Sequence, residues 1–134
     1  MKLTRTELIV ELPNEPGALA KVCERLQTEG LNIVALMVHA NADQMDGRLY
    51  LITDQPDTAS QMLSEIGYKV TTTDVLCLEI VNRPGSLARI LNALGAKKVN
   101  IMYCYVTSHY RGEPTFMIMR VDDVVKAVEA LREN

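Results

Sequence analysis

A six-residue pattern, Asn-x-Pro-Gly-x-Leu, occurs twice in the chain, and its residue types suit the binding of a small charged ligand. The two copies consist of Asn14, Glu15, Pro16, Gly17, Ala18, Leu19 and of Asn82, Arg83, Pro84, Gly85, Ser86, Leu87. A Pro-Gly turn that enters a helix exposes backbone N–H groups and the positive end of the helix dipole, and both favour a carboxylate. Glycine lets a ligand approach the backbone closely, and an Asn carboxamide both donates and accepts hydrogen bonds.

A second asparagine follows each copy at the same distance along the chain. It opens the pair Asn32-Ile33 in the first half and the pair Asn100-Ile101 in the second. Two interpretations are open for all of these asparagines. They contact a ligand, or they shape the local backbone, because Asn is common at helix caps and turns for structural reasons alone.

The elements that position these residues follow from an internal repeat. A shift of 68 residues without a gap makes 16 of 66 aligned pairs identical, including Asn14 with Asn82 and Asp54 with Asp122. The identities fall at turns and at apolar positions, as a duplication predicts. The 134 residues therefore predict two small domains in tandem, residues 1–74 and residues 75–134.

Each half has the periodicities of alternating strands and helices. In the first half, period-two patterns predict strands near 8–12, 32–40, 49–53 and 68–72. An apolar stripe at i, i+3, i+4, i+7 predicts a helix after Pro16, and Asp54 is expected to cap a second helix, as Asp122 does in the second half. The order is β-α-β-β-α-β, an α+β fold with an antiparallel sheet.

Two features of this plan remain open. The second copy lacks its last strand, because a full copy would extend nine residues beyond Asn134. The strand that begins at Leu76 then needs a neighbour from residues 68–72, from the N-terminal residues or from a second chain. The strand near 32–40 is apolar on both faces, with Ile33, Ala35 and Met37 on one and Val34, Leu36 and Val38 on the other. Since domains of about 60–70 residues bury little surface, we expect a homodimer.

Composition excludes several classes of function. The formal charge is −3, the sequence pI is about 5.4 and there is no Trp, so nothing indicates nucleic-acid binding. No apolar run is long enough to span a bilayer, and the first seven residues do not look like a signal peptide, so we expect a cytoplasmic protein without membrane contact. The three Cys and two His residues have no metal-ligand spacing. We expect no catalytic residues, no metal and no cofactor.

Taken together, the two turns and the paired Asn-Ile steps resemble the ACT domains, small amino-acid-sensing modules of metabolic regulation. The resemblance covers nearly the whole chain, twice, and implies two ferredoxin-like ACT repeats in tandem. It implies that the loop Asn and the Asn opening the second strand hold an amino acid across an interface between paired domains. The implied ligand-binding residues are Asn14, Glu15, Pro16, Gly17, Ala18, Leu19, Asn32, Ile33, Asn82, Arg83, Pro84, Gly85, Ser86, Leu87, Asn100 and Ile101. Serine-binding ACT domains carry a His two residues before the loop Asn, where this chain has Leu12 and Ile80, which suggests a less polar ligand or an empty site in one half.

The leading hypothesis is a non-catalytic regulatory protein that binds an amino acid at ACT domain interfaces and modulates a metabolic enzyme. The alternative is a protein-interaction or scaffold module with a degenerate ligand site, which Leu12 and Ile80 favour. An enzyme or a metal carrier on the same fold would need other motifs in place of Asn-x-Pro-Gly, such as Cys-x-x-Cys for the metal carrier, and the sequence has none of them.

Overall fold

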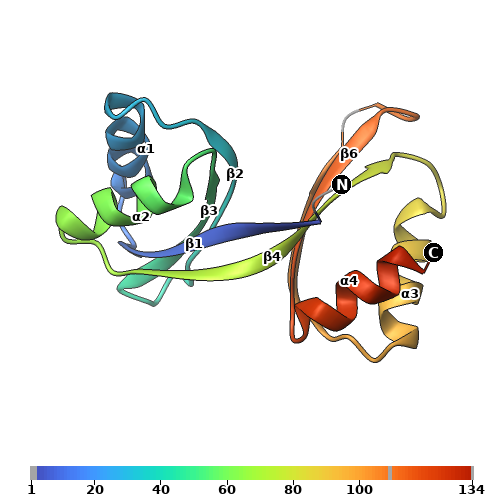
Figure 1. Cartoon of the computed structure of the whole chain (residues 1–134). Coiled ribbons are helices and arrows are strands. Elements are labelled where there is room, and N and C mark those ends of the chain that lie inside the picture. The colour runs from blue at the N-terminus through green and yellow to red at the C-terminus, as the bar shows by residue number, and fades with distance from the viewer. Residues whose placement is uncertain (1–2, 109, 134) are drawn as a thin grey trace. The chain divides into compact units, whose positions relative to one another are not determined.

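The computed structural model describes residues 3–108 and 110–133, and its elements follow the predicted order (Figure 1). They are β1 Thr4–Pro13, α1 Ala18–Thr28, β2 Ile33–His39, β3 Asp46–Thr53, α2 Pro56–Glu65, β4 Val70–Val81, α3 Ser86–Ala96, β5 Ile101–Thr107, β6 Pro114–Val121 and α4 Val124–Arg132. The α+β class and the two β-α-β-β-α-β repeats, the second without a final strand of its own, are confirmed. His109, one of the two His residues, lies outside the described residues.

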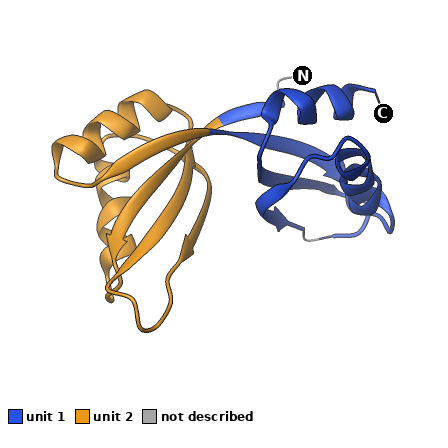
Figure 2. Cartoon of the chain, turned by 90° about the horizontal axis from the view of Figure 1, so that it is seen from below, with its two compact units in different colours: residues 1–5, 74–134 blue, residues 6–73 orange. Residues whose placement is uncertain are grey.

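The chain forms two compact units (Figure 2). The first-repeat unit is Thr6–Thr73, and the second-repeat unit consists of the described parts of Met1–Arg5 and Asp74–Asn134. The N-terminal segment therefore belongs to the unit formed by the second repeat. In hydrogen-bonding order the strands are β2-β3-β1-β4-β6-β5, and β1 and β4 each contribute to both units.

The N-terminal residues complete the second sheet. The backbone N–H of Cys77 in β4 donates to the carbonyl oxygen of Leu3 at 2.8 Å. In the first-repeat unit, Glu11 N donates to Lys69 O at 3.1 Å. The residue numbers of both bonded pairs have the same sum, as one continuous antiparallel register requires. The structure thus selects one of the three segments that the sequence left open as the neighbour of the strand at Leu76, and Leu3 also packs against the second core.

A single strand replaces two predicted ones. The sequence predicts separate strands near 68–72 and from Leu76, whereas β4 runs unbroken from Val70 to Val81. Nothing in this segment interrupts it, because it contains no Gly or Pro and is rich in β-branched Val and Thr.

Each unit has its own core between one face of the sheet and two helices. In the first-repeat unit, Leu8, Val10 and Leu12 of β1 alternate inward. They meet residues of the sheet and of both helices, namely Val22, Leu26, Leu31, Leu49, Leu51, Ala59, Met62 and Leu63. The second core repeats the plan with Leu76, Leu78, Leu94, Val99, Met117, Met119, Val121, Ala127 and Ala130. Since each fully buried Leu or Met contributes about 1.5–3 kcal/mol, these clusters dominate the stability of each unit.

A β-bulge changes which side chains of β2 lie on the helix-covered face of the sheet. The register with β3 shifts between Ile33 and Ala35, and Ile33 packs against the first core. Beyond the shift, Leu36 lies opposite Leu51, which is a core residue, so Leu36 shares the helix-covered face with Ile33. The predicted division of β2, with Ile33 and Leu36 on opposite faces, is wrong because the bulge adds one residue to the strand. The same shift occurs between Ile101 and Tyr103 in β5.

Candidate functional site

Both Pro-Gly turns lead into helices through a glycine in the left-handed region. Gly17 has φ +86° and is the N-cap of α1, and Gly85 has φ +89° and is the N-cap of α3. Neither helix receives a side-chain cap at this end, and a Cβ built on either glycine would meet no heavy atom within 4 Å. The positive ends of both helices are therefore open to the surroundings, as binding of a carboxylate requires.

The side chains of the loop asparagines donate hydrogen bonds to the hairpin loop that follows β2 or β5. Asn14 donates from Nδ2 to the carbonyl oxygens of Asn41 at 3.0 Å and Gln44 at 2.9 Å. Asn82 donates from Nδ2 to Tyr110 O at 3.1 Å. Of the two interpretations that the sequence leaves open for these residues, the structure therefore supplies a local structural role for their amide donors.

The strand-opening asparagines are held by aspartates from the far end of the next strand. Asn32 N donates to Asp54 Oδ1 at 3.0 Å, and Asp54 N donates back to Asn32 O at 3.1 Å. The second repeat has the same pair of bonds, with Asn100 N to Asp122 Oδ1 at 3.0 Å and Asp122 N to Asn100 O at 3.0 Å. These reciprocal bonds fix the backbone position from which each Asn side chain extends.

The predicted helix caps at Asp54 and Asp122 are therefore wrong. The N-cap of α2 is Gln55, which makes no side-chain capping bond, and the N-cap of α4 is Asp123, whose Oδ1 accepts from Lys126 N at 3.0 Å. Sequence reasoning took an Asp before a helix for a cap, which is the commoner use of that residue. The identity of Asp54 with Asp122, and of Asn32 with Asn100, across the repeat is the sequence feature that fits this pairing.

Within one unit the two kinds of asparagine lie at opposite ends of the sheet. Pro13, next to Asn14, pairs with Asp46 at the start of β3, whereas Ile33, next to Asn32, pairs with Thr53 at its end. Asp46 and Thr53 are about 23 Å apart at the usual rise of a strand. The second repeat matches, since Val81 pairs with Pro114 and Ile101 with Val121. A single amino acid cannot touch both asparagines of one repeat.

The remaining predicted residues divide between surface and core. Glu15, Pro16, Arg83 and Pro84 are exposed in the turns. Ala18 is buried, whereas Leu19 and Ile33 pack at the margin of the first core. In the second repeat, Ser86 and Ile101 are half-buried and Leu87 is exposed. The open part of each turn is therefore its Asn-x-Pro-Gly segment.

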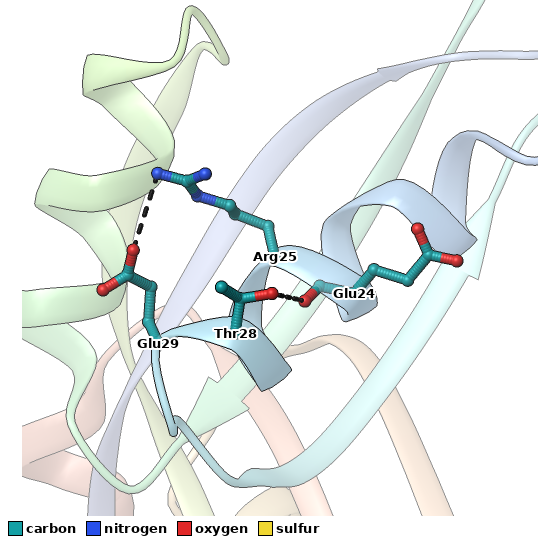
Figure 3. Close-up of polar contacts among 4 residues, drawn as sticks. All are labelled: Glu24, Arg25, Thr28 and Glu29. Carbon is teal, nitrogen blue, oxygen red and sulfur yellow. Dashed lines mark hydrogen bonds and ion pairs between the residues drawn. The ribbon is translucent and has the colours of Figure 1, made fainter.

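Asn32 and Ile33 line a shallow pocket of about 420 Å³ at the C-terminal end of α1. The other lining residues are Cys23, Gln27, Gly30 and Leu31. Two contacts order the last turns of the helix, an ion pair between Arg25 and Glu29 at 3.5 Å and a bond from Thr28 Oγ1 to Glu24 O at 2.9 Å (Figure 3). The carboxamide of Asn32 has no hydrogen-bond partner in the described part of the chain, so it is available to a ligand.

The cysteine of this pocket is not an activated nucleophile. Burial raises the pKa of the Cys23 thiol, so the thiol stays protonated at neutral pH. Burial also raises the pKa of Cys77, with a smaller opposing effect from the Arg5 guanidinium, and that of Cys104. Cys23 and Cys77 are half-buried, and Cys104 is exposed on the edge strand β5.

Residues 3–108 and 110–133 contain no candidate metal centre and no candidate membrane-spanning helix. No cluster of three or more His, Cys, Asp or Glu side chains is arranged to hold a metal ion. None of the helices in these ranges has the length and apolar character needed to cross a membrane.

Comparisons with known proteins agree with this architecture. A family model described as an ACT domain pair matches residues 3–134. The crystal structure of protein BT0572 from Bacteroides thetaiotaomicron is similar with a TM-score of 0.89 and 33% sequence identity, over 98% of this chain and 88% of that one. None of the curated proteins compared with the chain matches it.

Two further solved structures share the fold at lower identity. The ligand-free regulatory subunit of aspartate kinase from Thermus thermophilus gives a TM-score of 0.70 at 18% identity, over 98% of this chain and 93% of that one. The regulatory subunit from Thermus flavus gives 0.63 at 19% identity, over 98% and 96%. With the repeated turns, the duplicated β-α-β-β-α-β order and a family match that spans almost all residues, the chain belongs to the ACT domain pair family.

Proposed function

We propose that this chain is a non-catalytic regulatory protein that binds a free amino acid and modulates a separate metabolic enzyme. The observation that carries the proposal is the duplicated arrangement of two open groups, the helix start at Gly17 or Gly85 and the carboxamide of Asn32 or Asn100. A helix start suits the carboxylate of an amino acid, and a carboxamide suits its ammonium group. The similarity of the fold to regulatory subunits of aspartate kinase supports a regulatory role acting on another chain.

The distance between the two groups supports a site made by pairing. Because the two groups lie at opposite ends of the sheet within a repeat, one ligand contacts both only when the turn of one repeat meets the strand start of another. A ligand held in this way stabilises the paired arrangement and so reports its own concentration.

Homodimerisation through the sheet edges would supply such a pairing. β2 and β5 are the terminal strands of the hydrogen-bonding order. Leu36 and Val38 of β2 are 37% and 46% exposed although they lie on the face that the helices cover. Cys104 and Val106 of β5 repeat this placement. An open edge with exposed apolar side chains is a ready template for another strand.

A thermal-shift screen of the full chain against the twenty L-amino acids tests the proposal. At least one amino acid is expected to raise Tm by several degrees, because a ligand at 100 times its Kd adds about 2.7 kcal/mol. Asn100→Ala should reduce the shift, and Asn92→Ala, at an exposed position on α3, should leave it unchanged. A folded protein that none of the twenty amino acids stabilises would contradict amino-acid binding.

The scaffold alternative has two observations in its favour. The Nδ2 donors of Asn14 and Asn82 are already engaged by hairpin carbonyls, and Leu12, two residues before Asn14, is a core residue. A pull-down that recovers the same enzyme with equal yield, with or without each amino acid, would favour the scaffold. A yield that depends on one amino acid would favour the regulatory sensor.

A further inference from the structure

A groove of about 500 Å³ lies on the sheet of the first-repeat unit, beside the hairpin loop that Asn14 holds and away from the pocket at Asn32. Its lining residues are Glu11, His39, Gln44, Met45, Asp46, Gly47, Arg48 and Tyr50. They come from the three adjacent strands β1, β2 and β3 and from the loop between β2 and β3. The core side chains of β1 and β3 alternate with Glu11, Arg48 and Tyr50, so the groove lies on the sheet face opposite the helices.

Three charged or ionisable residues form a row across this face. Glu11 pairs with Arg48, and Arg48 pairs with His39, in the registers of β1 with β3 and of β2 with β3. Directly opposed side chains in antiparallel strands have Cβ atoms about 4.5–5.5 Å apart. Asp46 lies on the same face of β3, two residues before Arg48. Two cationic or donor groups therefore adjoin two carboxylates within the span of a small molecule.

The Arg48 guanidinium has no partner in the described part of the chain. Glu11, its cross-strand neighbour, instead approaches Lys69 Nζ at 3.9 Å, and no ion pair or hydrogen bond of Arg48 or His39 occurs among the described side chains. A guanidinium presents several N–H donors in a planar fork that matches a carboxylate. Arg48 is thus placed to bind a ligand carboxylate without first breaking an internal ion pair.

The backbone beneath the row is closely packed. A Cβ on Gly47 would lie 2.9 Å from Ala40 Cβ and 3.1 Å from His39 O, so only glycine fits there. This close approach of β2 and β3 fixes the neighbours His39 and Arg48 relative to each other.

We propose that this groove binds the charged backbone of a free α-amino acid, as a second ligand site that the family's turn motif does not include. Arg48 and His39 hold the carboxylate, and Glu11 and Asp46 hold the ammonium group. A simple anion would meet repulsion from the two carboxylates, and a simple cation would meet it from Arg48, so the groove favours a zwitterion.

Only the first repeat carries this set of residues. The corresponding positions of the second repeat are Glu79, Thr107, Pro114 and Phe116, and Phe116 pairs with both Glu79 and Thr107. The site therefore occurs once per chain, whereas the turns that carry the proposed function occur twice.

Chemical-shift titration of the ¹⁵N-labelled full chain with glycine tests the proposal, because glycine has the shared backbone charges and no side chain. Acetate and methylamine, each with one of the two charges, are the matched probes. Glycine should shift the amides of His39, Gly47 and Arg48, and each half-probe should bind at least about tenfold more weakly, as loss of a charge-assisted contact predicts.

Arg48→Gln should weaken glycine binding about tenfold or more, and Arg89→Gln, an exposed control on α3, should leave it unchanged. His39→Gln serves as a second variant if the dispersion of the Arg48→Gln spectrum shows loss of folding. Equal binding of acetate and glycine, or shifts confined to the turns and to Asn32, would overturn the groove site. Shifts confined to the groove would support the groove site, and the thermal-shift screen would then test the proposed site at the turns separately.

Discussion

Asn14 holds the hairpin loop after β2 with two side-chain hydrogen bonds, and Asn82 does the same in the second repeat with one. The loop asparagine is therefore part of the turn and also holds the neighbouring hairpin loop in place. Asn32 and Asn100 differ, because their backbones are fixed by Asp54 and Asp122 while their carboxamides point to no partner among the described residues. At the residue scale, the strand-opening asparagines are the stronger candidates for ligand contact.

The glycine at the helix start is required by its backbone conformation. Gly85→Ala should lower the free energy of unfolding by about 1 kcal/mol, because φ is +89° and the added Cβ meets nothing that compensates. Gly95→Ala, inside α3 and equally unobstructed, should raise it by about 0.5–1 kcal/mol. Urea unfolding of both variants measures the difference. Equal effects of the two substitutions would contradict the assigned conformations.

The reciprocal hydrogen bonds between Asp54 and Asn32 lead to a separate prediction. Asp54→Ala should destabilise the chain by about 1–2 kcal/mol, because the Asn32 N–H loses a charged acceptor. Asp54→Asn keeps an oxygen at that position and should cost less than half as much. Asp43→Ala, in the exposed loop before β3, is the control. An Asp54→Ala variant as stable as the control would show that these hydrogen bonds contribute nothing to the free energy of unfolding.

Residue types at the turns were predictable from the sequence because the repeat aligns them twice. The partners of those residues were not predictable. An Asp that precedes a helix has the same local sequence whether it caps that helix or bonds to a strand 22 residues earlier, as Asp54 does to Asn32. Only the tertiary arrangement decides between the two roles.

At the scale of elements, β1 and β4 each extend through both compact units. The second repeat has no final strand of its own, and Leu3–Arg5 takes that place beside β4. Without it, the β4 residues of the second-repeat unit would present an open edge next to the core.

Leu3→Ser should selectively loosen the second-repeat unit, since Leu3 packs against the second core and its carbonyl accepts from Cys77 N. Native-state hydrogen exchange should show a faster Cys77 amide, while the amides of β3 keep their protection. Arg5→Lys is the control, because it preserves the strand and its charge. Uniform loss of protection in both units would contradict a selective role for the N-terminal strand.

The order and type of the elements could be predicted from apolar periodicity, because each helix and strand buries one side. Two features could not. The bulges in β2 and β5 insert a residue without a Gly or Pro to mark them, and the continuity of β4 depends on strand partners that periodicity does not identify.

At the scale of the whole molecule, the duplication produces two copies of each candidate group and two open edge strands. We expect the chain to dimerise through these edges. Leu36→Lys should shift a dimer toward monomer in sedimentation equilibrium, because a charge on an exposed edge opposes strand pairing. Cys104→Lys tests the other edge, and Met45→Lys, at a hairpin position that is 89% exposed, is the control. A dimer that survives both edge variants would place the interface elsewhere.

The proposed contacts at the turns and at the strand starts are common to all amino acids. In the proposed site, the ligand meets backbone N–H groups and carboxamides, which recognise the charged groups common to all amino acids. We expect discrimination between amino acids to come from the side chains that lie next to these groups in the paired arrangement.

The most direct test of amino-acid binding between paired repeats is a crystal structure grown with the amino acid that gives the largest thermal shift. The account predicts ligand density that touches the turn of one repeat, at Gly17 or Gly85, together with the strand-opening Asn32 or Asn100 of a different repeat. Density that contacts a single repeat, or crystals of liganded protein with no density at any turn, would contradict it.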